Sequence, residues 1–186
     1  MKNAAKWKLK RYLMAHALKH LPLTIILYMG ILSILLFPVS FEDNSMAWFG
    51  GYFACPVICI FLTRTLLSAL KAVNRSFSAL DEAGKLDKVL ADFAQAEKAM
   101  GGNLYIGSLG LYGKGSKIVA LYPDMQQLYS VLSDRRGQHP RDLKFVDLRG
   151  NDLFICELDP IGQSNTEIEQ LYRFVEKKNP AVKAGQ

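Results

Sequence analysis

Apolar positions form one almost unbroken stretch near the start of the chain, from Leu21 to Leu70. Its first run, Leu21–Val39, contains 19 residues and no charged side chain. As a helix this run spans about 28 Å, close to the hydrocarbon thickness of a bilayer. A second uncharged run follows at Met46–Thr63. Because a backbone in hydrocarbon must satisfy its own hydrogen bonds, the pattern predicts a transmembrane helical hairpin over residues 21–70.

The distribution of charge around these runs predicts their orientation. Glu42 and Asp43 lie in the segment that joins the runs, which has no basic residue. The basic residues of the flanks are Lys2, Lys6, Lys8, Lys10, Arg11 and Lys19 before the first run, and Arg64, Lys71 and Arg75 at the end of the second. Since Lys and Arg accumulate on the cytoplasmic side, we expect a multi-pass protein of the cell membrane with both termini in the cytoplasm.

The first 20 residues are expected to form a basic cytoplasmic flank beside anionic lipid. A surface-lying amphipathic helix fits less well, because Leu9 falls nearly opposite Trp7 on a helical wheel. The side chains expected to anchor the protein at the membrane interface are Trp7, Tyr12, Trp48 and Arg64.

A secretory signal peptide is the competing interpretation of this N-terminal region. A basic segment precedes an apolar one, and Ser45-Met46-Ala47 loosely resembles a cleavage site. The apolar segment is longer than a typical signal core, however, and a second apolar run follows it directly. Both features favour the membrane hairpin.

Helical spacing continues after the hairpin and then gives way to short strand-like runs. The segment 71–102 is expected to form a connecting amphipathic helix that extends to about residue 100 and stops at Gly101-Gly102. The following runs, separated by Gly, Asp, Asn and Pro, are 104–106, 111–112, 118–122, 127–132, 143–148 and 153–158. They predict a small antiparallel meander with its clearest hairpin turn at 148–153 and a basic loop at 133–141.

The last predicted element is an amphipathic helix near the C-terminus. Ile168, Leu171 and Val175 recur at helical spacing, and Ser164 with Glu167 has the pattern of a capping box. A helix after several strands must bury its apolar stripe against the sheet. We therefore expect residues 103–186 to form a cytoplasmic α+β domain in which this helix caps the meander.

This order of elements resembles a group of uncharacterised bacterial membrane proteins with two helices and a pleckstrin-homology-like cytoplasmic tail. The segments that carry the resemblance are 105–107, 117–121, 123–125, 128–131, Asn179-Pro180 and Gly185. The resemblance implies a pleckstrin-homology-like fold for the tail. It implies no activity, because none is assigned to the group.

Charge narrows the expected partners. The formal net charge is +6, and the basic residues of the first 20 positions account for all of it. A basic flank beside a membrane helix needs no nucleic acid to explain it. The basic cluster of the tail, Arg135, Arg136, Arg141 and Lys144 with His139, is a candidate contact for lipid headgroups or a protein partner. The alternative is a loop whose charges are simply solvated.

Three further patterns give weak chemical signals. Gly113–Lys117 superficially resembles a phosphate-binding loop, but strand-like residues follow it and a turn is the simpler interpretation. Cys55 and Cys59 share one face of the second apolar run and are expected to pack against the first. With Cys156 and the scattered histidines, they form no pattern typical of a metal, a cofactor or a catalytic triad.

Together these features lead to one leading expectation and one alternative. We expect a non-enzymatic, membrane-anchored module whose cytoplasmic domain binds a protein partner or the inner-leaflet surface. The alternative is an accessory subunit of a membrane transport complex, in which the hairpin packs against a larger partner.

Overall fold

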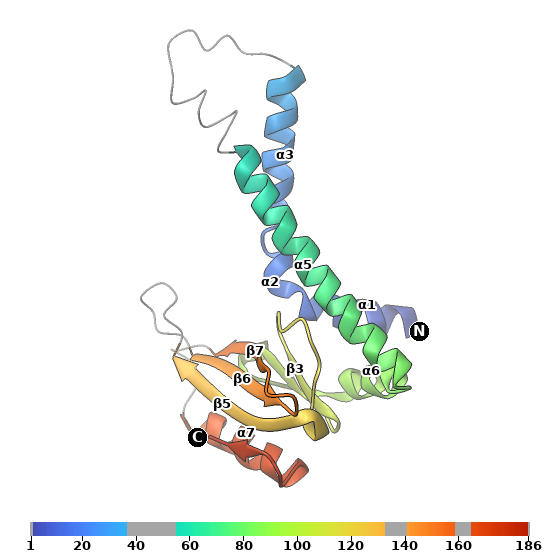
Figure 1. Ribbon diagram of the computed structural model, residues 1–186, viewed down its shortest axis with the longest axis vertical. Coiled ribbons are helices and arrows are strands. Elements are labelled where there is room, and N and C mark those ends of the chain that lie inside the picture. Colours follow the sequence, from blue (N-terminus) through green and yellow to red (C-terminus); the bar gives the residue numbers. More distant parts are fainter. Residues whose placement is uncertain (1, 37–54, 133–140, 159–164, 186) are drawn as a thin grey trace. The chain divides into compact units, whose positions relative to one another are not determined.

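The computed structural model describes residues 2–36, 55–132, 141–158 and 165–185, which form two compact units (Figure 1). The apolar unit is His16–Lys71. The second unit, called the domain below, combines Met1–Ala15 with Ala72–Gln186. The domain is therefore built from two segments of chain that flank the apolar unit in the sequence.

The apolar unit is helical in its described part. Its helices are α2 (Ala15–Leu18), α3 (Leu21–Leu36) and the first part of α5 (Cys55–Glu82). The segments Ala15–Leu32 and Cys55–Glu82 are long and apolar enough to cross a membrane, and only 6% and 17% of their most apolar stretches are buried. The hydroxyls of Tyr28 and Thr63 form a hydrogen bond of 3.0 Å between α3 and α5.

The strands of the domain form two sheets of four. The first sheet has the order β1 (Glu97–Ala99), β2 (Leu104–Ile106), β3 (Gly110–Gly113) and β4 (Ala120–Leu121), all antiparallel. The second has the order β7 (Asp152–Leu158), β6 (Arg141–Asp147), β5 (Met125–Leu132) and β8 (Lys183–Ala184). In this sheet β8 runs parallel to β5, and the other pairs are antiparallel.

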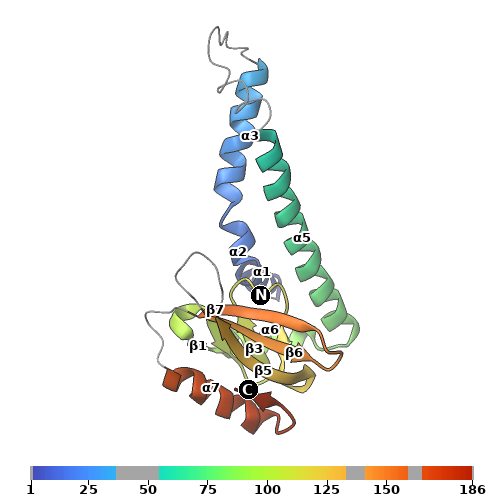
Figure 2. The same cartoon turned by 60° about the vertical axis from the view of Figure 1, so that its left-hand side comes forward.

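Both sheets share one hydrophobic core with helix α7 (Asn165–Lys178), which lies below the strands in Figure 2. Leu111 of the first sheet, Leu143 of the second and Val175 of α7 are each fully buried in it. Close approach of the sheets is possible at Gly113, where a Cβ atom would lie 1.9 Å from the carbonyl oxygen of Ile155. A glycine is required there because any side chain would collide with the opposite backbone.

The N-terminal helix α1 (Lys2–Leu13) is part of the domain and contacts α6 (Leu86–Gln95) and β3. Leu9 and Leu13, one helical turn apart, are fully buried. The basic flank expected over residues 1–20 is thus, up to Leu13, a helix with a buried apolar face. Because Leu9 and Trp7 lie on opposite sides of the helix, Leu9 faces the domain while Trp7 faces outward.

A strand is found in each of the six expected runs, although the run 118–122 is a strand only at Ala120–Leu121, and the turn at 148–153 joins β6 to β7. The helix expected up to residue 100 is wrong beyond Gln95. Ala96 has extended backbone angles, and Glu97–Ala99 form β1 instead. The expected single meander is replaced by two sheets, one of which includes a parallel strand. The C-terminal helix is confirmed as α7, while its expected cap Ser164 lies outside the described residues.

A candidate binding cleft between β1 and helix α7

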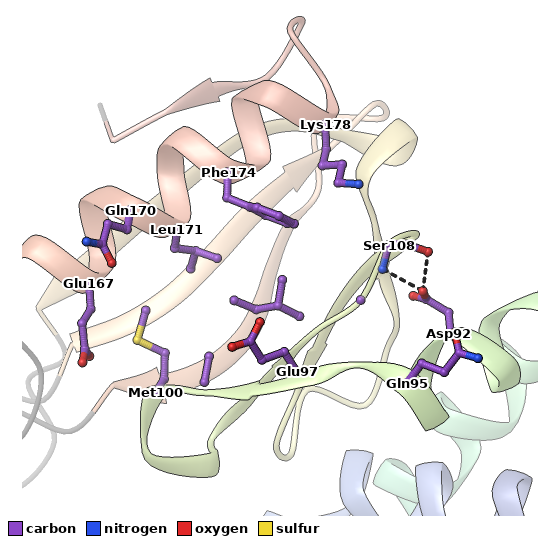
Figure 3. A pocket seen from close by; sticks show the side chains of 13 residues that line it. Asp92, Gln95, Glu97, Met100, Ser108, Glu167, Gln170, Leu171, Phe174 and Lys178 are labelled. Carbon is purple, nitrogen blue, oxygen red and sulfur yellow. Dashed lines mark hydrogen bonds between the residues drawn. The ribbon is translucent and has the colours of Figure 1, made fainter.

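A cleft of about 700 Å³ lies between the first sheet and α7 (Figure 3). The residues of α7 that line it are Glu167, Gln170, Leu171, Phe174 and Lys178. These positions follow the helical repeat and so lie on one side of α7. The neighbouring stripe, which includes Ile168 and Val175, faces the core. One helix therefore packs into the core and also forms a wall of the cleft.

The opposite wall comes from β1, β2 and the end of α6. Glu97 and Ala99 are alternate residues of β1, so their side chains point to the same face of the sheet. Ile106 lies opposite Glu97 across the strand pair and lines the same face. Met100, which is 6% exposed, is at the base of the wall (Figure 3). The interior of the cleft is apolar because these residues meet Leu171 and Phe174 across it.

The rim of the cleft is polar and carries more negative than positive charge. Glu97 and Glu167 are exposed carboxylates on opposite walls. Within the described part of the chain, neither is seen in an ion pair. The cation of the rim, Lys178, lies 5.6 Å from the centre of the Phe174 ring. Because Glu97 and Glu167 form no ion pair among the described residues, both carboxylates are available to a positively charged ligand.

Asp92 closes the α6 end of the cleft and is 8% exposed. Its Oδ1 accepts hydrogen bonds from the Ser108 amide (2.7 Å) and hydroxyl (2.6 Å). Its Oδ2 accepts from the Leu109 amide (3.1 Å) and from the Tyr112 hydroxyl (2.6 Å). With four donors, this carboxylate joins α6 to the turn between β2 and β3.

These hydrogen bonds determine the protonation of the group. Burial raises the pKa of Asp92, but the hydrogen bonds from Ser108, Tyr112 and Leu109 outweigh it, so the pKa lies below its ordinary value. Burial and the neighbouring carboxylate raise the pKa of Tyr112. Asp92 therefore stays ionised at neutral pH, and each of its two carboxylate oxygens already accepts two hydrogen bonds. It acts as a structural link at the edge of the cleft, not as a general acid or base.

Two residues of the expected basic cluster fall in the described part of the chain, and the structure gives them separate surroundings. Arg141 lines a second, smaller cleft of about 320 Å³ with Tyr129, Glu169 and Tyr172. Lys144 forms an ion pair of 3.5 Å with Asp152. Arg135 and Arg136 lie outside the described residues. The role of the cluster in headgroup or partner binding stays a prediction.

The expected interface anchors also differ in their surroundings. Trp7 is 62% exposed, with the Arg11 guanidinium 5.4 Å from its ring. Arg64 is exposed on α5, and Trp48 lies outside the described residues. Tyr12 is half-buried in the domain, where its hydroxyl donates to the Gly102 carbonyl (3.0 Å) and its ring packs edge-on against Tyr105. Tyr12 thus packs within the domain, and the anchoring role of these four residues stays a prediction.

The turn at Gly113–Lys117 is confirmed as a connection between the antiparallel strands β3 and β4. Its amides bind the end of a helix, not a phosphate. Gly115 N donates to the Tyr12 carbonyl (3.1 Å), and Lys117 N donates to the Leu13 carbonyl (3.2 Å). The last carbonyls of a helix lack partners within the helix, so this turn caps α1.

The cysteines lie apart from the cleft. Cys55 and Cys59 are on α5, and Cys156 is fully buried in the domain core. Burial, and to a smaller extent the nearby Asp142, raises the pKa of Cys156 to about 12. Over the described ranges, no group of three potential metal-ligating side chains occurs. Cys156 therefore lacks the lowered pKa of a nucleophilic thiol.

The sequence alone did not indicate this cleft. The sequence pattern assigned Glu97 and Ala99 to a helix that was expected to continue to about residue 100. Their alternation as strand residues was therefore not recognised. The second stripe of α7, formed by Glu167, Gln170 and Phe174, was a usable signal. Phe174 lies at the border of the two stripes, because it lines the cleft and also packs edge-on against Tyr122 of the core, with ring centroids 6.1 Å apart.

These elements define the protein as a mixed α+β domain joined to two apolar helices, with a partly apolar cleft at the edge of a sheet. No protein-family model, no curated protein and no solved structure matches the chain.

Proposed function

We propose that the chain is a membrane-anchored, non-enzymatic interaction module whose domain binds a protein partner in the cleft between β1 and α7. The observation that carries the proposal is the cleft itself, which combines an apolar interior with two exposed carboxylates, Glu97 and Glu167. Binding sites are typically clefts of this size that combine apolar surface with polar groups able to orient a ligand. The nearest buried carboxylate, Asp92, is fully engaged in holding the fold.

Exposed apolar side chains support the membrane part of the proposal. On α3, Ile26 and Met29 are 66% and 59% exposed, and on α5, Val57 and Phe61 are 65% and 69% exposed. So large an apolar surface is unfavourable in water and requires lipid or another protein as a cover. The lengths of the two candidate spans match a bilayer, and this favours lipid.

The packing of α1 supports the expected topology. The segments before and after the apolar unit fold together, with Leu9 and Leu13 buried in one domain. A domain folds on one side of a membrane, so the chain between its two segments must cross an even number of times or not at all. Two candidate spans satisfy this requirement. The excess of Lys and Arg in the flanks then favours the cytoplasm for both termini.

A pleckstrin-homology-like fold for the domain is part of this proposal. Its support is the arrangement of two mainly antiparallel sheets around one core that a C-terminal helix completes. The fold by itself implies no ligand, whereas the cleft offers a surface for one.

Photo-crosslinking from the cleft tests the proposed function. A photoreactive amino acid replaces Gln170, which lines the cleft, in the full chain in its native membrane. The matched control position is Glu176, which is exposed on the same helix but does not line the cleft. We expect a discrete protein adduct from position 170 that Glu97→Lys with Glu167→Lys abolishes, and no such adduct from position 176.

Two results would contradict the proposal. Adducts only with lipid would assign the cleft to the membrane surface, and equal adducts from both positions would mean non-specific contact. The transport-subunit alternative predicts instead a cross-link through Cys55 to a membrane protein, and this cross-link would not depend on Glu97 and Glu167.

A further inference from the structure

The edge strand β1 supplies Glu97 and Ala99 to one wall of the cleft, and the backbone of Lys98 lies between them. In the described part of the chain β1 pairs with β2 alone, in the register Glu97 with Ile106 and Ala99 with Leu104. The other sheet edge, at β4, is distant in strand order from the cleft. An unpaired strand edge presents amide and carbonyl groups that another extended segment can pair with.

The register shows which backbone groups of β1 face outward. The bonds from Gly107 N to Gly110 O (3.0 Å) and from Lys114 N to Asn103 O (2.8 Å) bracket the pairing of β2 with β3. Since hydrogen-bonded pairs alternate along antiparallel strands, Leu104 and Ile106 direct their backbone groups toward β1. Their partners Ala99 and Glu97 face β2, and the backbone N–H and C=O of Lys98 point outward.

The side chains around this edge specify what could occupy it. An added strand beside β1 would place alternate side chains toward α7, where Met100, Leu171 and Phe174 provide apolar surface. Glu97 and Glu167 line the same space from opposite walls (Figure 3). The rim carries Asp92, Glu97 and Glu167 against Lys178, and Asp92 already has four donors. Charge complementarity therefore favours a cationic occupant.

We propose that the cleft binds an extended peptide segment of a partner protein that pairs with the backbone of Lys98, placing a Lys or Arg side chain near Glu97 and Glu167 and an apolar side chain against Phe174. This inference rests on the proposed function and specifies the chemistry of its partner. With three residues, β1 offers a single outward pair of backbone groups. The side-chain contacts in the cleft must therefore supply most of the selectivity.

A short labelled peptide of alternating valine and lysine is a suitable probe for the full chain in lipid nanodiscs. Two control peptides isolate the interactions. In one, glutamate replaces lysine, which reverses the charge. In the other, alternate amides are N-methylated, which removes the donors of an added strand. Fluorescence anisotropy measures the dissociation constant of each, and we expect binding of the first peptide alone.

A pair of substitutions at one position tests the backbone contact. Lys98→Pro removes the outward N–H without breaking a bond to β2, because proline is tolerated on a strand edge that faces away from the sheet. Lys98→Ala keeps the N–H and removes the same charge. We expect Lys98→Pro to weaken binding about tenfold or more, and Lys98→Ala to leave it nearly unchanged. Glu97→Gln with Glu167→Gln should also weaken binding and reduce its dependence on salt.

Two results would overturn the inference. In the first, the N-methylated or the glutamate peptide binds as tightly as the valine-lysine peptide. In the second, none of the three peptides binds. The comparison of the three peptides uses the unmodified protein, so it stands even where Lys98→Pro fails to fold. A discrete adduct from position 170 without peptide binding would retain the proposed function and reject strand addition. Absence of both would reject the two together.

Discussion

The amide of Gly115 donates a hydrogen bond of 3.1 Å to the carbonyl oxygen of Tyr12. It joins the end of α1 to the turn between β3 and β4, across the whole apolar unit in sequence. The Tyr12 hydroxyl adds a second connection to the Gly102 carbonyl (3.0 Å). The N-terminal segment is therefore a structural part of the domain. A fragment that begins after the apolar unit lacks the helix that covers α6 and β3.

The buried face of α1 is expected to contribute strongly to stability. Leu13→Ala should lower the free energy of unfolding of the domain by about 2–4 kcal/mol, because a fully buried leucine leaves a cavity when it is truncated. Denaturant titration of the full chain in mild detergent, followed by Tyr and Trp fluorescence, measures the change. Trp7→Ala is the control on the same helix, since Trp7 is 62% exposed. An equal effect of both substitutions would contradict this packing.

The carboxylate of Asp92 makes the stability of the domain depend on acid pH. Its pKa is lowered from the ordinary value of 3.8 in the folded state, so its contribution is present above that value and is lost as the pH falls through the folded value. Asp92→Asn should remove this dependence and cost about 2–3 kcal/mol near neutral pH, because an amide cannot accept from all four donors.

Unfolding curves of the Asp92 variant at several pH values between neutral and acid test this expectation. Asp81→Asn is a suitable control, since Asp81 is exposed at the end of α5. A wild-type protein and an Asp92→Asn variant with the same loss of stability in acid would show that another group is responsible.

Cys156 is expected to be unreactive in the folded domain. Burial raises its pKa to about 12, so almost no thiolate exists at pH 8, and the sulfur is fully enclosed. In a variant with Cys55→Ala and Cys59→Ala, maleimide should label Cys156 only after denaturation. Adding Glu176→Cys provides an exposed thiol on α7 as a positive control. Rapid labelling of Cys156 in the native protein would indicate that the domain core is open.

The proposed topology is testable with cysteines that an impermeant maleimide can reach from one side of the membrane. In the background without Cys55 and Cys59, Lys8→Cys and Arg173→Cys should be labelled only in inside-out vesicles. Asn44→Cys, in the segment between the two apolar runs, should be labelled only in right-side-out vesicles. Labelling of positions 8 and 173 from opposite sides would contradict the shared domain, because α1 could not then pack against α6.

Local patterns were sufficient for most of the secondary structure. The six strands between residues 104 and 158 were predicted from period-two runs between turn residues, and α7 from its buried stripe. The turn at Asp147 was also readable, because its side chain accepts from the amides of Arg149 (2.9 Å) and Asn151 (2.8 Å) within a few residues. Each of these features depends on residues close together in the chain.

The elements that position the cleft were not predictable in this way. Glu97–Ala99 continue the composition of α6, and they form a strand only because β2 supplies hydrogen bonds to them. Leu9 was considered only as part of a helix on the membrane surface, whereas the helix that carries it packs against α6 and β3.

By itself, the sequence determined two apolar runs of bilayer length, the order of β2 to β7 and α7, and the net charge of the flanks. These are properties of composition and of short-range periodicity. The tertiary structure decided that α1 belongs to the domain, that the strands divide into two sheets, and that β1 and α7 enclose a cleft. Such features depend on which surfaces, distant in the sequence, pack against each other. An apolar stripe in the sequence shows that it must be buried, but it does not identify the element that buries it.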